Sequence, residues 1–289
     1  MPTRSVAQVM YIFHSGSGVA RRHGLASRPS RIRCNRRLAE LCYSRARLNS
    51  AEAPRITFER EGWLLIPHLL DRAKVEVLLA ATDDLERAAA GFERDTRVRR
   101  VFFQMQSASG KKGEPAIFPG ALRKITSPSS GQPAFDRLRR DPAVLSAVVS
   151  CGLVAPRCLI DQVNLKLPLV GSGFPYHQDE SFLFGDALGR VQRFGGVNLV
   201  IALDPADAEN GGFEVLGRTH QGPLLDVPYD TSAPNTGLFD ESHRVLAPLS
   251  PGDALLFHPR LAHGSRPNRS ERPRRLITLW FGGSSPQGL

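Results

Sequence analysis

The sequence predicts a mainly β domain in which a sheet closes on itself and helices pack on one side. From Cys158 onward, short strand-like runs are separated by Gly, Pro and Asp about every eight to fifteen residues, which is typical of barrels and sandwiches. Before that point, residues 72–90 and 135–152 place apolar side chains at helical spacing. The 289 residues, 41% of them hydrophobic, suffice for one sizeable core.

The N-terminal segment is predicted to lie outside this domain. Residues 1–50 contain ten Arg and a single acidic residue, Glu40, so they carry nearly all of the net charge of +10. A segment rich in Arg and Ser and poor in acids is typical of a mitochondrial transit peptide, and a start codon assigned too far upstream is the alternative. We therefore predict a basic, disordered extension over residues 1–53 and one domain over residues 54–289.

Composition also limits the partners. The basic segment has no aromatic interleaving, zinc-ligand spacing or helix-turn-helix pattern, so nucleic acid is not an expected partner. No apolar run approaches the ~18 residues of a membrane span. The four cysteines show no CxxC spacing, which predicts reduced thiols and a cytoplasmic protein, or a mitochondrial one if the extension is a transit peptide. Nothing in the sequence indicates an oligomeric state.

The first elements of the domain are predicted from local signals. Residues 57–67 indicate a short helix or turn followed by a strand, and Asp71 is the expected N-cap of the helix over residues 72–90. Residues 98–106 indicate a strand, and residues 107–120, with their Gly, Lys and Pro, a mobile loop. Phe103, Met105, Phe182 and Phe184 are candidates for an apolar substrate pocket, and core packing explains them equally well.

Residues 159–167 alternate between apolar and polar side chains, as a half-buried strand does. This alternation places Gln162, Asn164 and Lys166 on one face. That face either lines a site or is the solvated side of an edge strand, and the pattern leaves both readings open.

Residues 194–203 indicate a buried strand, and the turn that follows contains Asn210 and Gly211, which both tolerate positive φ. Residues 221–243 are rich in Pro, Asp and Ser. They predict a long excursion of the kind that often covers an active site.

The stretch Tyr176-His177-Gln178-Asp179 is a candidate metal site. In an extended strand, side chains two apart point to the same face, so His177 and Asp179 can meet at one point. With a second histidine from a distant strand, two His and one carboxylate form the facial arrangement of non-haem Fe(II) oxygenases. His-x-Asp alone also arises by chance. His220, His243 and His258 compete with His263 for the third position.

Several motifs together resemble the phytanoyl-CoA dioxygenase family of Fe(II)- and 2-oxoglutarate-dependent oxygenases. They lie in family order between about residue 54 and the C-terminus: Phe58–Pro67, His177–Leu183, Glu209–Phe213 with Gly217–His220, Pro251–Phe257, and His263–Ser265 through Arg274. The sequence departs from the family at Gly217-Arg218-Thr219-His220, where Gly-Ser-His is common. That segment is structural, so the resemblance stands.

The resemblance implies a double-stranded β-helix, the jelly-roll fold of cupins, with Fe(II) and the cosubstrate 2-oxoglutarate bound inside. It assigns catalysis and the metal to His177, Asp179 and His263, and cosubstrate binding to Arg274, Ser265 and Lys124. Gln162, which the alternation of residues 159–167 places on a possible site face, is a further candidate for cosubstrate binding. For Lys124 and its neighbour Arg123, surface charge is the alternative. Arg274 and Arg275 are adjacent in a strand and must leave on opposite faces, and the resemblance selects Arg274.

The implied activity is hydroxylation of an aliphatic C–H of a small molecule with dioxygen, releasing succinate and CO2. Desaturation and ring closure are alternatives within the same chemistry. The resemblance implies that halogenases of this kind lack the carboxylate ligand. Because Asp179 supplies this carboxylate here, a halogenase is disfavoured. A cupin-like metal-binding or sensory protein without oxidation activity is the alternative from another class.

Overall fold

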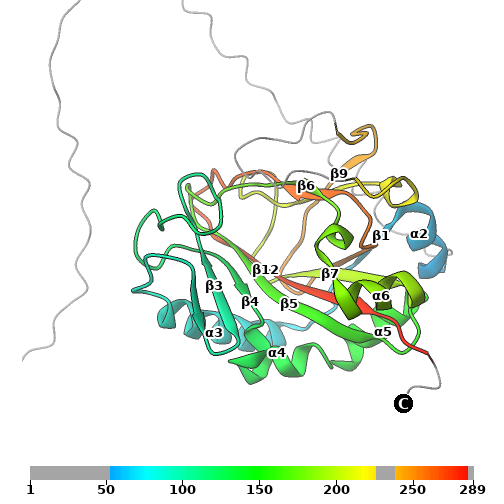
Figure 1. Ribbon diagram of the computed structural model, residues 1–289, viewed down its shortest axis with the longest axis horizontal. Coiled ribbons are helices and arrows are strands. Elements are labelled where there is room, and N and C mark those ends of the chain that lie inside the picture. The colour runs from blue at the N-terminus through cyan, green and yellow to red at the C-terminus, as the bar shows by residue number, and fades with distance from the viewer. Residues whose placement is uncertain (1–52, 226–237, 286–289) are drawn as a thin grey trace, which may run out of the picture.

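The computed structural model describes residues 53–225 and 238–285. The predicted extension, apart from Ala53, and the middle of the predicted excursion, residues 226–237, lie outside this range. Two antiparallel sheets face each other, and helices cover the outer face of the larger sheet (Figure 1). This is the double-stranded β-helix that the sequence predicted. No helix in the described ranges is both long and apolar enough to cross a membrane.

The larger sheet has eight strands, and every hydrogen-bonded pair is antiparallel. Their spatial order is β1 (Trp63–Ile66), β10 (Ala254–Phe257), β7 (Gly196–Ala202), β12 (Arg274–Gly282), β5 (Arg157–Lys166), β4 (Leu122–Thr126), β3 (Val101–Met105) and β2 (Thr96–Val98). Because β5 lies between β12 and β4, the reading of residues 159–167 as an edge strand is wrong. Residues 98–106 are not one strand, since the chain turns between β2 and β3 at Arg99 and Arg100.

The smaller sheet consists of β6 (Phe174–His177), β11 (His263–Ser265), β8 (Phe213–Leu216) and β9 (Arg244–Ala247), in that order. In the β6–β11 pair, His177 lies directly opposite His263. Opposite residues on antiparallel strands have neighbouring side chains. The register of this sheet therefore brings together two histidines that are far apart in the sequence.

The helices follow their capping signals. They are α2 (Pro54–Glu61), α3 (Arg72–Ala88), α4 (Pro133–Leu138), α5 (Pro142–Ser150) and α6 (Gly185–Phe194), with 3-10 turns η1 (Pro128–Ser130), η2 (Asp179–Phe182) and η3 (Thr219–Gln221). Asp71 caps α3 as predicted, accepting a hydrogen bond from the Lys74 amide at 2.8 Å. The single helix predicted over residues 135–152 is two helices, because Pro142 has no N–H and Asp141 caps a new start. Helix α6 was not predicted.

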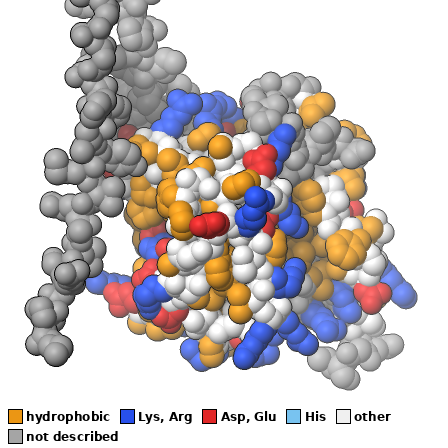
Figure 2. All heavy atoms as spheres, turned by 60° about the vertical axis from the view of Figure 1, so that its left-hand side comes forward, with side chains coloured by type: hydrophobic (Ala, Val, Ile, Leu, Met, Phe, Trp, Pro, Cys, Tyr) orange, Lys and Arg blue, Asp and Glu red, His pale blue; other side chains and the backbone are white. Residues whose placement is uncertain are grey.

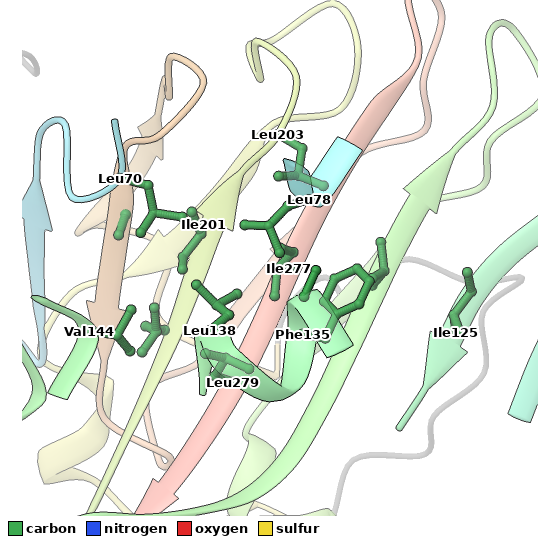
Figure 3. Close-up of a cluster of buried hydrophobic side chains, with 14 of the residues drawn as sticks. Leu70, Leu78, Ile125, Phe135, Leu138, Val144, Ile201, Leu203, Ile277 and Leu279 are labelled. Carbon is green, nitrogen blue, oxygen red and sulfur yellow. The ribbon is translucent and has the colours of Figure 1, made fainter. Parts of the chain in front are cut away.

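The main hydrophobic core lies between the outer face of the large sheet and helices α3, α4 and α5. Figure 3 shows Leu78, Phe135, Leu138 and Val144 of the helices against Ile201, Ile277 and Leu279 of the strands.

Phe103 and Met105 belong to this core, so of the two alternatives that the sequence left open the core is correct for them and the substrate pocket is wrong. Their neighbours Phe102 and Gln104 line the inner cavity instead, because alternate residues of β3 face opposite sides. Of the other two candidates, Phe182 lines the cavity and Phe184 is 84% exposed.

Candidate active site

A cavity of about 770 Å³ lies against the inner face of the large sheet, with part of the small sheet as its opposite wall. His177, Asp179, His263, Ser265, Arg274, Gln162 and Lys124 all line it. The structure thus brings every residue that was nominated for the metal and the cosubstrate into one cavity.

His177, Asp179 and His263 form a compact group. One ligand atom from each lies within 4.8 Å of the other two, and the Nε2 atoms of both histidines lie 3.5 Å from Asp179 Oδ1. Strand β6 ends at His177, and Asp179 begins η2, but Gln178 between them keeps an extended backbone with φ −115° and ψ 122°. One extended residue is enough to put His177 and Asp179 on the same side. In the described part of the chain, no other His, Cys, Asp and Glu residues form such a group.

The remaining imidazole nitrogens fix the tautomers. Nδ1 of His177 lies 2.7 Å from the Pro175 carbonyl, and Nδ1 of His263 lies 2.9 Å from the Leu261 carbonyl. A carbonyl oxygen only accepts, so each Nδ1 carries the proton and donates it. Each Nε2 is then left with a lone pair directed at the space shared with Asp179, which is the arrangement of a metal ligand.

Burial and mutual charge set the protonation of this group. Burial alone would raise the pKa of Asp179, but the two imidazoles, His263 above all, hold it well below its ordinary value. Burial, followed by the proximity of His263, lowers the pKa of His177. At neutral pH the group therefore offers a carboxylate beside a neutral His177 imidazole.

Asn198 holds the second oxygen of this carboxylate. Its Nδ2 donates to Asp179 Oδ2 at 2.8 Å, and the residue is 2% exposed. Asn198 therefore engages Oδ2 of Asp179, whereas Oδ1 is the oxygen that faces both histidines. Sequence reasoning missed Asn198, although a lone amide in the otherwise apolar strand Gly196–Ala202 was an available signal.

Gln178 ties the metal turn to its surroundings. Its side chain is buried, donates to the carbonyls of Arg260 at 2.8 Å and Pro223 at 3.2 Å, and accepts from the Leu225 amide at 2.8 Å. Gln178 lies between the candidate ligands His177 and Asp179, and its side-chain amide is held both as a donor and as an acceptor. These contacts limit movement of the turn.

Arg274 projects into the cavity and is 1% exposed. Its one contact with a described hydrogen-bond acceptor is long, 3.5 Å from Nη1 to the Asn164 carbonyl, and its Nε has none. Burial, reinforced by the charge of Arg123, lowers its pKa to about 9. The cation is therefore buried without a carboxylate, which is unfavourable unless an anion enters the cavity.

Arg275 leaves on the opposite side of β12. It donates to both oxygens of Asp204, at 2.8 and 2.9 Å, and to Asp83 of α3 at 2.7 Å. These carboxylates raise its pKa above the ordinary value. The predicted separation of the two arginines onto opposite faces is what the structure has.

The neighbouring cosubstrate candidates are also in place. Ser265 Oγ accepts from Lys166 Nζ at 2.7 Å, which leaves the Ser265 hydroxyl proton available to another acceptor. Gln162 of β5 lies opposite Thr278 of β12 on the cavity wall. Lys124 also faces the cavity, where burial and the charges of Arg123 and Lys112 lower its pKa to about 8.

Arg123 and Lys124 are not surface charges. Arg123 is 1% exposed, donates to Ser172 Oγ and, at 3.0 Å, to the Gly173 carbonyl, and its guanidinium lies 4.0 Å above the Phe174 ring. Arg123 does not itself line the cavity, but its positive charge lowers the pKa values of Arg274 and Lys124, which do.

The competing histidines are structural. His258 Nδ1 accepts from the Arg260 amide at 3.0 Å, and its ring packs 5.3 Å from that of His220. Burial lowers the pKa of His258 to about 4. Neither residue nor His243 lines the cavity.

Known proteins resemble this chain in sequence and in fold. A family model described as phytanoyl-CoA dioxygenase (PhyH) matches residues 58–276. The chain is 34% identical over 248 residues to the peroxisomal phytanoyl-CoA dioxygenase of Rattus norvegicus, covering 78% of this chain and 67% of that protein. It is 26% identical over 253 residues to the L-proline trans-4-hydroxylase of Streptomyces griseoviridis, covering 78% and 84%.

Other matches are shorter. The phytanoyl-CoA dioxygenase domain-containing protein 1 of Danio rerio is 28% identical over 157 residues, which is 51% of this chain and 52% of the relative. The chain thus spans about half the length of this curated relative and its mammalian counterparts.

Solved structures share the fold. The non-heme alpha ketoglutarate dependent epimerase SnoN from nogalamycin biosynthesis superposes with a TM-score of 0.60 at 18% identity, covering 82% of this chain and 85% of that chain. EctD from S. alaskensis, solved with 2-oxoglutarate and 5-hydroxyectoine, has a TM-score of 0.60 at 19% identity, covering 81% and 78%. At these identities the likeness establishes the architecture of the two sheets.

Proposed function

Because the chain belongs to the phytanoyl-CoA dioxygenase family, we propose that it is an Fe(II)- and 2-oxoglutarate-dependent oxygenase. His177, Asp179 and His263 would hold the iron. The observation that carries this proposal is the combination, in one cavity, of a two-histidine, one-carboxylate group and a buried arginine without a carboxylate partner.

The donor set fits Fe(II). Imidazole and carboxylate suit this ion, and two His with one carboxylate leave three coordination positions open. Bound Fe(II) would supply the activation of dioxygen, coupled to the conversion of 2-oxoglutarate to succinate and CO2. The protein's own part is to keep Asp179 ionised and oriented, which Asn198 does through Oδ2, and to keep both Nε2 lone pairs available, which the Pro175 and Leu261 carbonyls do.

The cavity also fits 2-oxoglutarate, a dianion. Its far carboxylate needs a buried, hydrogen-bonded cation, and the Arg274 guanidinium offers a planar fork for two parallel hydrogen bonds. Ser265, whose oxygen already accepts from Lys166, has a hydroxyl proton to donate to the same carboxylate. Gln162 and Lys124 line the same cavity and are proposed as further contacts of the cosubstrate.

We propose hydroxylation of an aliphatic C–H of a small molecule as the reaction. The support is that relatives covering most of this chain are named as a hydroxylase of L-proline and as a phytanoyl-CoA dioxygenase. Hydroxylation adds one oxygen atom to the substrate, whereas desaturation and ring closure remove two hydrogens, so product mass separates these outcomes. A metal-binding protein without oxidation activity is the weaker alternative, because it would leave the Arg274 charge uncompensated.

The test uses the full chain. Fe(II) is titrated under argon, 2-oxoglutarate is added, and succinate is measured after admission of air. We expect 2-oxoglutarate to bind tightly only after Fe(II), and succinate to accumulate slowly without substrate and faster with one. Failure to bind either Fe(II) or 2-oxoglutarate contradicts the proposal.

We also propose residues 54–289 as the catalytic domain. The motif set begins there, and α2 already packs Phe58 into the core. A chain that begins at Ala51 is expected to keep its melting temperature and its succinate release. A large fall in melting temperature would place the basic segment against the core.

A further inference from the structure

One end of the cavity is strongly basic. Arg97, Lys112 and Lys124 line it there, together with Lys111, whereas Asp179 is the one acidic side chain in the described cavity lining. Figure 2, which brings the β3 end of the large sheet forward, shows basic side chains in blue among the hydrophobic ones in orange. The cavity therefore has a negative group only at the metal candidates.

Arg97 and Lys112 are held at this end by the same aromatic ring. The Arg97 guanidinium lies 5.1 Å, and the Lys112 ammonium 4.9 Å, from the centroid of Phe102. Neither side chain forms an ion pair or hydrogen bond with a described residue. Cations over an aromatic face are placed without being neutralised, so both charges remain available to a ligand in the cavity.

A charge balance shows that the cofactors alone do not neutralise this end. With Fe(II) and 2-oxoglutarate bound, their opposite double charges cancel, and Asp179 offsets Arg274. The charges of Arg97, Lys111 and Lys112 then remain, together with that of Lys124. An anion supplied by the substrate would restore the balance.

The wall between the two ends is polar. Gln104, Thr126 and Gln162 line the cavity on the adjacent strands β3, β4 and β5, with Thr126 opposite both Phe102 and Gln162. Their side chains form no hydrogen bond with a described residue. A bound apolar chain would cover these groups and leave them unsatisfied, which is unfavourable.

Sheet geometry gives the reach of the substrate. Arg97 lies in the edge strand β2, and Asn198, which contacts Asp179, lies in β7, with β12, β5, β4 and β3 between them. At about 4.8 Å per strand, the path across the strands along the curved face is about 24 Å. A substrate that contacts both Arg97 and the metal would follow this inner face.

We propose that Arg97 and Lys112 bind a carboxylate or phosphate at one end of a hydrogen-bonding substrate whose other end is oxidised at the metal. This inference rests on the proposed function and adds the substrate class to it. It disfavours a neutral or purely hydrocarbon substrate.

The first experiment measures anion binding by the full chain loaded with Fe(II) and 2-oxoglutarate under argon, so that the Arg274 site is filled. The probes are inorganic phosphate and acetate, titrated by calorimetry. The variants are R97Q/K112Q and the matched control R94Q/R100Q, which removes two exposed charges from the same region that do not line the cavity. Arg97 and Lys112 are exposed as well, so each should contribute up to about fivefold in affinity, and the combined loss in R97Q/K112Q should be about tenfold or more.

The outcomes separate the alternatives. Phosphate or acetate should bind the loaded wild type and R94Q/R100Q within twofold of each other, and R97Q/K112Q at least tenfold more weakly. The tighter probe identifies the anion class. Equal losses in both double variants, or no binding to the wild type, overturn the proposal.

A second experiment compares substrates directly. Succinate release is measured with a panel of carboxylates and phosphate esters and with their methyl esters or amides, which lack the charge. Stimulation by the anions alone is expected, and equal stimulation by the uncharged analogues overturns the substrate class. If the wild type binds no Fe(II) or 2-oxoglutarate, the proposed function itself fails, whereas intact cofactor binding with no anion preference refutes only the present inference.

Discussion

The two faces of the large sheet use the same kinds of residue in opposite ways, and Arg274 and Arg275 show it most directly. On the outer face, Arg275 is paired with Asp204 and Asp83. On the inner face, Arg274 is more deeply buried and has no carboxylate beside it. Two adjacent residues of one type thus differ completely in how their charge is satisfied.

The difference distinguishes a structural group from a binding group. A saturated arginine contributes to stability, and its removal leaves carboxylates without a partner. A buried, unsaturated arginine destabilises the folded protein until a ligand arrives, so its presence is evidence for an anionic ligand. The same contrast extends along β3, β4 and β5, because their outer face packs in the main hydrophobic core, whereas Gln104, Thr126 and Gln162 on their inner face form no side-chain hydrogen bond with a described residue.

The largest difference between the two faces is expected when one carboxylate is removed from each. Asp179→Ala on the inner side should abolish Fe(II) binding and succinate release, because it removes the charged ligand between the two imidazoles. Asp204→Ala on the outer side should lower the melting temperature and leave Fe(II) affinity intact. Calorimetric Fe(II) titration under argon measures both. An Asp179→Ala protein with full Fe(II) affinity would refute the assignment.

The arginine pair gives the next largest effect. Arg274→Ala should weaken 2-oxoglutarate binding by about 2–5 kcal/mol, which is more than tenfold, because it leaves a buried carboxylate without its partner. Its folding stability without ligand should not fall, since an unpaired buried cation is removed.

Arg275→Ala should show the reverse: a lower free energy of unfolding and nearly unchanged 2-oxoglutarate affinity. Urea unfolding and 2-oxoglutarate titration of both variants decide the matter. If Arg275→Ala instead weakened 2-oxoglutarate binding and Arg274→Ala lowered the free energy of unfolding, Arg275 would bind the cosubstrate. The inference from the unpaired charge of Arg274 would then be wrong.

Much of this contrast was predictable from the sequence because it depends on alternation. Period-two patterning placed Gln162 and Asn164 on one face, and the adjacency of Arg274 and Arg275 required them to separate. Which face is the inner one did not follow, since both sides of residues 276–281 are apolar. Only the resemblance to a family selected Arg274.

Other features needed the tertiary structure. The opposition of His177 and His263 depends on pairing between distant strands, which no local pattern encodes. The sequence left Phe103 open between the pocket and the core, and Phe102, which lines the cavity, was not nominated, because the hairpin at Arg99 and Arg100 was not predicted. The hydrogen bond from Asn198 to Asp179 joins residues of different elements. Its one signal in the sequence was an amide within an apolar strand.

Asn198 tests whether a side chain that contacts only a metal ligand contributes to Fe(II) affinity. Asn198→Leu keeps a similar volume but removes the donor to Asp179 Oδ2, and such outer partners of metal ligands typically contribute about 10–100-fold in affinity. We expect Fe(II) binding to weaken by that amount while the protein stays folded.

Asn210→Leu is the matched control. This amide is also buried, but it holds the Pro205 carbonyl and the Asp207 amide in a turn. Its replacement should cost stability and leave Fe(II) affinity unchanged. If both variants bind Fe(II) like the wild type, Asn198 has no positioning role.

The smallest expected effect is the pH dependence of stability that Lys124 contributes on the inner face. Burial, with the charges of Arg123 and Lys112, lowers its pKa from 10.5 to about 8 in the folded protein. Below about pH 8 the side chain is protonated in both the folded and unfolded states, so the folded protein bears the full cost of holding a desolvated charge. Between about pH 8 and 10.5 the unfolded state keeps the proton and the folded state has released it, so this cost falls as pH rises.

Lys124→Met removes the titration and should therefore be more stable than the wild type near pH 7, with a difference that shrinks steadily towards pH 10.5. Lys124→Arg, which keeps the charge at all of these pH values, should retain the deficit throughout. Urea unfolding of the three proteins at intervals from about pH 7 to 10 measures the differences. A gap between wild type and Lys124→Met that does not change with pH would show that Lys124 is solvated like a residue of the outer surface, and the contrast between the two faces would then not extend to this side chain.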